Sequence, residues 1–561
     1  MNGKKLMALL LVLALCSGVL SACGKQLVAP DTKPAETTPG ETKPTETGLA
    51  ETTEPIPEVT GQRNAEFYPI DFGGTLTMAT TMTNGDQAHN YLLMEELTGV
   101  DIDWKVMAVD RIPQLFVGDG EMPDMFMNVG GITKSQVQEY GAEGKLVNFL
   151  DKEILNKMPN LKAAYEADPK LFDGVKDYTG AAYALPYYCH TLTMGSNLFY
   201  IRTDMTKEAG IEELPSTVEG FLEMCETLKN YYAHVEGYVP MVTNGGAGVK
   251  YTGAYTTFFF PAFGEYLTPG VGITEDNSSV YAGFATEQYR NYLRFMNTCW
   301  EAGYLDPNCY TVDSRTDKQA LIDRKATMNP FATYLTPDNF ASGELEFQVM
   351  PPVTSQYQTE ARWAMPNRYR TSTYMIASAC RDLDAACAFM DALYTTEENP
   401  IRDEEGVKVW GISLWLGEIG KITFVDKESG TYQVVSTYPD GNCFHLSSAG
   451  HGSSAYVDWP YVEKDGTGLM VKALGTRDIL EPKGVFTLDA SVLALNPEEQ
   501  EAYNSCWNSI EQKVNEMTAA FITGGADLDT QWDAYLNDLK ELGLETVLGC
   551  YRNALDRYNA R

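Results

Sequence analysis

The sequence predicts an α/β protein with two lobes and a helical C-terminal part, on three observations. Residues 75–82 and 100–107 have the pattern of strands, and residues 86–97 between them have the pattern of a helix. Such a strand–helix–strand unit favours a parallel sheet with a right-handed crossover. The chain of 561 residues exceeds the ~250–300 residues at which a single hydrophobic core usually stops growing. The third observation is that the last 65 residues or so read as helices almost throughout.

The remaining elements follow from capping residues and from glycines that end helices. Asp86 can cap the first helix and Gly99 ends it. A capping pattern begins the helix at Thr217, and Gly303 ends the helix expected over 286–302. Residues 404–490 are rich in glycine and aromatic residues and poorly periodic, so no element is assigned there. The expected strands are 75–82, 100–107, 125–129, 183–188, 198–204, 325–329, 347–350 and 373–377, and the expected helices are 86–97, 135–143, 155–166, 217–229, 286–302, 317–324, 383–394, 497–518, 529–542 and 545–558.

The N-terminus has the layout of a secretory signal. Lys4 and Lys5 precede an apolar run over residues 6–20, which is too short and wrongly flanked for a spanning helix. The following residues, 20–23 (LSAC), resemble the lipobox of bacterial lipoproteins. That resemblance implies removal of residues 1–22 and attachment of a diacylglyceryl lipid to Cys23. The alternative is an ordinary secretion signal with a cysteine nearby.

The body of the protein is expected to follow a linker. Residues 23–66 consist of Cys23 and a stretch built mostly from Thr, Pro, Glu, Lys and Gly, which cannot bury enough apolar surface to fold. Proline and like charges keep such a segment extended, so it would act as a spacer. Residues 67–561 would form the two lobes, the first from about 67–195 plus 325–400 and the second from about 196–324 plus 401–561.

Composition excludes several classes of function. With 77 acidic and 42 basic residues the net charge is −35, which argues against nucleic acid or an anionic lipid surface as a partner. The nine cysteines beyond Cys23 are scattered and do not form a disulfide framework. Cys443, His445 and His451 match no zinc spacing, so no metal and no cofactor is expected. GxSxG, HExxH and phosphate-binding loops are missing from the sequence.

Six motifs, in order along residues 70–560, resemble those of the extracellular solute-binding proteins of ATP-driven importers, and in particular the large carbohydrate-importer lipoproteins of Gram-positive bacteria (family 1-like). Each motif alone is common, but the order is specific. They are residues 118–124 (GDGEMPD), 183–186 (YALP), 200–205 (YIRTDM, with Met205 where the family usually has Trp), 300–307 (WEAGYLDP), 389–394 (FMDALY), and 521–524 (FITG) with 532–535 (WDAY).

The resemblance implies a two-lobed binding protein rather than an enzyme. It implies a type II-like periplasmic-binding-protein fold, in which hinge strands join two α/β lobes that close over a ligand. The chain would be a monomer, lipid-anchored on the outer face of the cell membrane, that captures a carbohydrate and delivers it to the membrane subunits of an ABC permease.

Most ligand-binding candidates lie where predicted strands end, because ligands of open parallel sheets meet the loops at the carboxyl ends of the strands. Trp363 and Arg368 belong instead to a separate cluster around residues 363–369 that also includes Arg370. Aromatic planes can cover the C–H faces of a sugar, and Asp, Asn and Arg can bond its hydroxyls. For each aromatic residue the alternative is core packing, and for Asn84 and Asp86 it is turn formation and helix capping. The candidates are Asn84, Asp86, Asn128, Tyr187, Tyr188, Phe331, Tyr334, Trp363 and Arg368.

Other functions remain open at this point. A surface glycoside hydrolase would use two carboxylates, but carboxylate pairs are so common in this acidic chain that they favour nothing. A binding protein for a non-sugar solute such as a peptide, or an adhesin without a small ligand, would fit the same composition.

Overall fold

The computed structural model describes residues 67–82, 89–118, 120–189, 198–330, 335–340, 342–344, 346–402, 406, 408–410, 423–434, 456–457, 462–464 and 468–561. These residues belong to one compact unit, Gly61–Arg561. The expected signal segment, Cys23 and the linker lie outside the described residues.

A mostly parallel sheet organises the N-terminal part of this unit. Strand β1 (Thr75–Thr80), helix α2 (His89–Thr98) and strand β2 (Asp101–Val106) form the expected strand–helix–strand unit, and β1 pairs with β2 in parallel from Thr75↔Asp101 to Thr80↔Val106. Strand β3 (Met125–Phe126) pairs in parallel with the other side of β1, and β12 (Met375–Ile376) pairs antiparallel with β3. The strand order is therefore β12-β3-β1-β2.

One expected helix is two helices. The segment expected as a helix over 155–166 forms α5 (Lys152–Asn156) and α6 (Pro159–Ala167). Pro159 lacks an N–H and begins the second helix, the position that proline prefers. The buried carboxylate of Asp391 accepts hydrogen bonds from the backbone N–H groups of Asn160 (3.2 Å) and Leu161 (2.9 Å), so it caps α6. The other helices here are α3 (Ile112–Val117), α4 (Lys134–Ala142) and α13 (Leu383–Asp391).

An antiparallel sheet organises the other part of the unit. Strand β5 (Tyr200–Arg202) lies between β8 (Met328–Asn329) and β9 (Phe347–Val349). The hairpin β6 (Val271–Ile273) and β7 (Val280–Ala282) lies elsewhere in this part. Its helices are α8 (Thr203–Glu208), α9 (Val218–Tyr231), α10 (Ala254–Phe259), α11 (Glu287–Glu301), α12 (Thr316–Ile322), α16 (Pro497–Thr523), α17 (Leu528–Glu541) and α18 (Leu544–Asn559).

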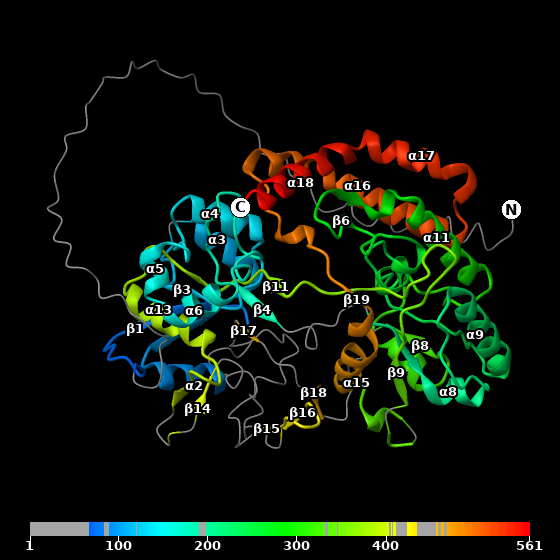
Figure 1. Cartoon of the computed structure of the whole chain (residues 1–561), viewed down its shortest axis with the longest axis horizontal. Coiled ribbons are helices and arrows are strands. Elements are labelled where there is room, and N and C mark those ends of the chain that lie inside the picture. Colours follow the sequence, from blue (N-terminus) through cyan, green and yellow to red (C-terminus); the bar gives the residue numbers. More distant parts are fainter. Residues whose placement is uncertain are drawn as a thin grey trace, which may run out of the picture. The chain divides into compact units, whose positions relative to one another are not determined.

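Buried apolar side chains separate into two main cores. The helices and strands that carry these cores form two lobes (Figure 1). The first lobe comprises residues 68–188 and 374–432, and the second comprises residues 198–353 and 480–561, which also contain most of a smaller, separate cluster around β5. The packing differs from the expected boundaries in two segments. Residues 328–353 pack with the second core because β8 and β9 pair with β5, and Ile401 to Tyr432 contribute to the first core.

The segment left unassigned from sequence contains short strands that connect to distant parts of the chain. The pair β10 (Trp363–Ala364) and β19 (Gly484–Val485) is parallel, and β4 (Tyr187–Cys189) lies between β11 (Tyr369–Arg370) and β17 (Tyr456–Val457). The remaining elements are β13 (Ile401–Arg402), β14 (Lys408–Val409), β15 (Thr423–Asp426), β16 (Thr431–Val434), β18 (Val462–Glu463) and α15 (Gly468–Gly475).

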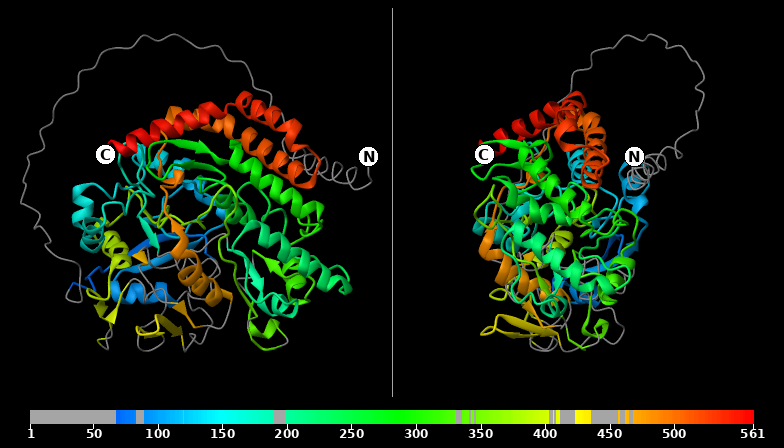
Figure 2. Two further views of the ribbon diagram at one scale, coloured as in Figure 1. Left: turned by 45° about the vertical axis from the view of Figure 1, so that its right-hand side comes forward. Right: turned by 90° about the vertical axis from the view of Figure 1, so that its right-hand side faces the viewer.

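The C-terminal helices α16 to α18, in orange and red, lie side by side along the second lobe (Figure 2). Asn496 and Glu499 form a capping box at the start of α16 with Pro497 in its first turn, and Gly524 ends this helix in the left-handed conformation with φ 71°. The end of α18 reaches the first lobe beside α4 (Figure 1).

Candidate functional site

The sheet of the first lobe has a point at which its strand order reverses. Strand β1 has β2 on one side and β3 on the other, and ligands of open α/β sheets bind outside the carboxyl ends of strands at such a point. Asn128 follows β3 there in a left-handed conformation, with φ 52°. Its Nδ2 donates a hydrogen bond to the Tyr91 hydroxyl (2.8 Å), and its side chain also hydrogen-bonds Tyr374.

Two neighbouring cavities open around this region. The smaller, of about 190 Å³, lies in the first lobe, and we call it the small recess. The larger, of about 580 Å³, is lined by both lobes and by the segment 363–371 that crosses between them, and we call it the inter-lobe cavity. Tyr187 and Thr371 line both.

The lining of the small recess is rich in hydroxyl and amide groups. Two of these side chains also bond the protein backbone. Thr373 Oγ1 accepts from the Val129 N–H (3.0 Å), and Gln138 Nε2 donates to the Lys176 carbonyl (2.9 Å). The lining residues are Asn128, Ile132, Thr133, Lys134, Val137, Gln138, Val175, Ala184, Tyr187, Thr371, Ser372, Thr373 and Tyr374.

Aromatic and planar polar side chains line the inter-lobe cavity together. The Tyr369 hydroxyl donates to Asp168 Oδ2 (2.8 Å), and burial followed by this hydrogen bond raises the pKa of Tyr369, so the hydroxyl stays protonated at neutral pH. The lining residues are Gly174, Tyr187, Thr257, Leu267, Thr268, Val271, Gly272, Trp363, Ala364, Met365, Pro366, Asn367, Tyr369, Arg370, Thr371, Thr487, Leu488, Asp489, Ala490 and Ser491.

Arg370 is the cation on the wall of the inter-lobe cavity. Its Nε donates to the Asn367 carbonyl (3.3 Å), and no ion pair joins it to an acid in the described part of the chain. Among the described lining residues Asp489 is the single acid, and its Oδ1 accepts from the Ser491 N–H (2.8 Å). The described lining of this cavity therefore offers no pair of carboxylates of the kind that a glycoside hydrolase uses.

The structure brings three of the sequence candidates to the cavities. Asn128 lines the small recess, Trp363 lines the inter-lobe cavity, and Tyr187 lines both. Tyr187 and Trp363 are 7% and 4% exposed, so most of each ring also packs in a core, which was the alternative for every aromatic candidate.

Other candidates lie beside the cavities or outside the described residues. Tyr188 is buried on β4 with its ring 5.8 Å from that of Tyr369, and Arg368 is half-buried just before β11, but neither is among the described lining residues of the small recess or the inter-lobe cavity. The candidates that lie outside the described residues are Asn84, Asp86, Phe331 and Tyr334.

The candidates chosen from the sequence leave out four polar or aromatic lining residues, Tyr369, Arg370, Asn367 and Asp489. The first three follow Trp363 within seven positions, in the aromatic and basic cluster that the sequence already indicates around Trp363 and Arg368. Asp489 gave no such signal, because it lies in the aperiodic segment before the C-terminal helices.

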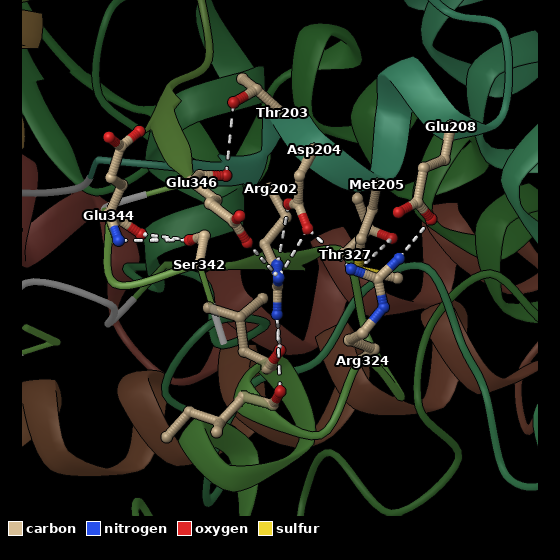
Figure 3. A network of polar contacts seen from close by, with 12 residues as sticks. Arg202, Thr203, Asp204, Met205, Glu208, Arg324, Thr327, Ser342, Glu344 and Glu346 are labelled. Carbon is tan, nitrogen blue, oxygen red and sulfur yellow. Dashed lines mark hydrogen bonds and ion pairs between the residues drawn. The ribbon is translucent and has the colours of Figure 1, made fainter. Parts of the chain in front are cut away.

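The motif of residues 200–205 has a structural role in the second lobe (Figure 3). The Arg202 side chain is 3% exposed and bonds Asp204 (2.6 Å), Glu346 (2.9 Å) and the Leu321 carbonyl (2.9 Å). Burial would raise the pKa of Asp204, but its hydrogen bonds and charge interaction with Arg202 outweigh burial and lower it. Arg202, Asp204 and Glu346 line neither cavity.

No metal site and no membrane span emerges from the part of the chain that the structure describes. Nowhere in it do three His, Cys, Asp or Glu side chains gather closely enough to hold a metal ion. None of its helices has both the length and the apolarity needed to cross a bilayer. Cys443, His445 and His451 lie outside the described residues.

Comparison with known proteins identifies the family. Residues 81–400, more than half of the chain, match the family described as bacterial extracellular solute-binding protein, and the chain belongs to that family. The expected resemblance is thus confirmed.

Individual relatives agree in fold. The fructooligosaccharide ABC transporter substrate-binding protein FusA of Streptococcus pneumoniae serotype 4 is 23% identical over 532 residues, covering 88% of this chain and 92% of FusA. The structure of FusA in complex with kestose has a TM-score of 0.64 at 18% identity, covering 87% of this chain and 100% of that one. An extracellular solute-binding protein from Bifidobacterium longum subsp. infantis has a TM-score of 0.66 at 16% identity, covering 86% and 98%. The expected two-lobed α/β fold is confirmed.

Proposed function

We propose that this chain is the substrate-binding component of an ABC importer, that it captures an oligosaccharide in the inter-lobe cavity, and that it delivers the sugar to a membrane permease. The observation that carries the proposal is the inter-lobe cavity itself, with aromatic rings, an arginine and amide and hydroxyl groups on walls from both lobes. Family membership and the likeness to FusA, whose name specifies a fructooligosaccharide, support it.

The chemistry of the walls suits a sugar better than a strongly charged solute. Tyr369, which is half-buried and lines the same cavity as Tyr187, can cover an apolar C–H face, and the fork of Arg370 can bond two neighbouring hydroxyls. Within the described lining of the two cavities the charges are Lys134, Arg370 and Asp489, which nearly balance. We therefore take Arg370, rather than its neighbour Arg368, as the basic ligand-binding residue.

The anchoring of the protein is a second part of the proposal. Removal of residues 1–22 and a diacylglyceryl group on Cys23 would hold the chain on the outer face of the membrane, with residues 24–66 as spacer. Two acyl chains hold a protein on a bilayer where one does not. Mass spectrometry of the mature N-terminus tests this part, and an unmodified Cys23 would contradict it.

Calorimetry tests the ligand class. The titrants are kestose, maltotriose, an acidic uronate trisaccharide and a tripeptide, each added to the wild type, to Arg370→Met and to the control Arg111→Met. Arg111 is on the surface of the first lobe, and among the described residues its side chain bonds only Gln114 (2.9 Å). A hydrogen bond with a charged partner contributes about 1.5 kcal/mol, so Arg370→Met should weaken sugar binding about tenfold while the control does not.

Three outcomes would contradict the proposal. Heat with the tripeptide but with no sugar would assign a peptide ligand. Release of new reducing ends from the trisaccharides would assign hydrolysis. Equal sugar affinity in the wild type and Arg370→Met would show that the sugar does not bind at the cavity wall that carries Arg370.

A further inference from the structure

Three side chains make long-range hydrogen bonds between the first lobe and the C-terminal part of the second lobe. Each bond links residues more than 350 positions apart, so each fixes the two lobes relative to one another rather than a local turn. Lys134 Nζ donates to the carbonyls of Ser491 (2.8 Å) and Val492 (3.5 Å), the Tyr558 hydroxyl donates to Asp173 Oδ2 (2.7 Å), and Arg561 Nη2 donates to the Asp177 carbonyl (2.7 Å).

On the second lobe these groups are held together by the lobe's own contacts. Arg557 bonds Glu499 at the start of α16 (Nη1 to Oε1, 2.8 Å) and the Ala494 carbonyl (3.0 Å), so the end of α18 is tied to the segment that carries Ser491. Asn559 Nδ2 donates to the Asn277 carbonyl in the turn of the β6–β7 hairpin (2.9 Å). The second-lobe side of the junction therefore moves as one piece.

The first-lobe groups are equally constrained. Lys134 begins α4, whose N-terminus is fixed by a capping box between Thr133 and Gln136. Asp173 is 8% exposed and also contacts Lys176 Nζ (3.4 Å). Burial lowers the pKa of Lys134 to about 8; Arg561 acts in the same direction, while Asp489 and Asp173 oppose it.

The junction borders both cavities. Lys134 lines the small recess, whereas Ser491 and Gly174, the residue after Asp173, line the inter-lobe cavity. A change in these contacts would therefore change the distance between the walls that face the ligand.

We infer that Lys134, Asp173, Asp177, Ser491, Tyr558 and Arg561 form a latch that holds the lobes in the arrangement seen here and so sets how readily the cavity opens. The predicted effect of the latch on ligand release rests on the proposed function. Its effect on the separation of the lobes needs no ligand.

Small-angle X-ray scattering on the ligand-free full-length protein tests the latch directly. Tyr558→Phe, Asp173→Ala and the double variant each remove the same hydrogen bond. Each should therefore raise the radius of gyration, and the double variant should exceed neither single variant by more than the error. Arg552→Ala is the matched control, because Arg552 is also on α18 and pairs with Glu545 of the same helix (2.9 Å). Thermal unfolding of each variant checks that it is folded.

Stopped-flow release of kestose gives the second measurement. Loss of one hydrogen bond to a charged acceptor should raise the dissociation rate about tenfold in Tyr558→Phe and leave it unchanged in Arg552→Ala. Scattering that is identical in the wild type and all latch variants overturns the latch, whatever the ligand. If the variants open but kestose fails to bind the wild type, the latch is supported and the choice of sugar is what fails.

Discussion

Asp124 connects three segments of the first lobe, so its replacement by asparagine is a sharp test of how that lobe is held together. It precedes β3, its Oδ2 accepts from the N–H and the hydroxyl of Thr77 on β1 (both 2.8 Å), and its Oδ1 accepts from the Arg381 N–H after β12 (2.9 Å). The guanidinium of Arg381 pairs with the same carboxylate (2.5 Å). The side chain of Asp124 is 4% exposed and that of Arg381 is 57% exposed.

The expected cost of Asp124→Asn is about 3 kcal/mol of unfolding free energy. Asparagine keeps one acceptor oxygen, so it can serve Thr77 or the Arg381 backbone but not both, and its amide N–H₂ then faces a donor. A bond to a charged acceptor contributes about 1.5–3 kcal/mol, and an unsatisfied buried donor adds about 1–3 kcal/mol. The exposed ion pair with Arg381 adds less than about 1 kcal/mol, because water and salt screen it.

The cost should depend on pH in a defined direction. Burial would raise the pKa of Asp124, but the hydrogen bonds from Arg381 and Thr77 outweigh it and lower the pKa well below its ordinary 3.8. The ionised carboxylate therefore stabilises the folded state fully above about pH 5. That stabilisation falls as the pH drops below the unfolded value of about 3.9, and it is lost at the folded pKa. Asparagine does not titrate, so the difference between wild type and variant should shrink between pH 5 and pH 3.

Urea unfolding followed by far-UV circular dichroism at pH 7, 5 and 3.5 measures this difference. Asp103→Asn is the control, because Asp103 lies on the exposed strand β2 and only pairs with Lys105 at the surface, so it should change stability by less than about 0.5 kcal/mol. A cost below about 1 kcal/mol at pH 7, or the same cost at all three pH values, would refute the account of Asp124.

Three further perturbations probe other parts of the molecule. Arg202→Met should lower the unfolding free energy by about 3–5 kcal/mol in urea titration, because Asp204 and Glu346 lose their buried partner; a loss below about 1 kcal/mol would contradict this. Gly141→Ala should destabilise α4 despite alanine's higher helix propensity, since the new Cβ would lie 2.0 Å from the Tyr183 ring; a raised melting temperature would contradict this. Cys225 is fully buried, and burial raises the pKa of its thiol, so a disulfide reagent at pH 8 should label it only after unfolding; rapid labelling of the native protein would contradict this.

The elements that were predictable from sequence are those whose signals are local. The first strand–helix–strand unit follows from periodicity, and α16 begins at Pro497 because a capping box and a proline mark its start. The break before Pro159 was equally readable, since proline at a helix start is a local signal. It was missed because the apolar periodicity runs on through residues 155–166.

The site was predictable only in part because pairing between distant segments builds it. Tyr187 was found as the end of an apolar run, but its neighbour Arg370 is set by the antiparallel register of β4 and β11, which no local pattern encodes. Short strands of two or three residues, such as β10 and β19, carry too little periodicity to be recognised. The placement of β8 and β9 in the second lobe likewise depends on their pairing with β5.

The same pairings fix which residues must move when the lobes move. Trp363 is attached to the second lobe, because it lies on β10 and pairs with Gly484 of β19. The Met365 N–H adds a hydrogen bond to the Val485 carbonyl (3.0 Å). Tyr369 belongs to the first lobe through β11, which pairs with Tyr188 of β4.

Residues 366–368 therefore connect two anchored strands, and any rotation of one lobe against the other must be absorbed there or at the other crossings. Pro366 restricts this connection on one side, and Asn367, whose Nδ2 bonds the Tyr369 carbonyl (2.6 Å), restricts it on the other. Because Trp363 and Tyr369 both line the inter-lobe cavity, a lobe rotation changes the spacing of the aromatic groups that would face a sugar. A sugar held in this cavity, as proposed, would therefore be coupled to lobe rotation through residues 366–368, and the proposed latch at Tyr558 would act on the same spacing.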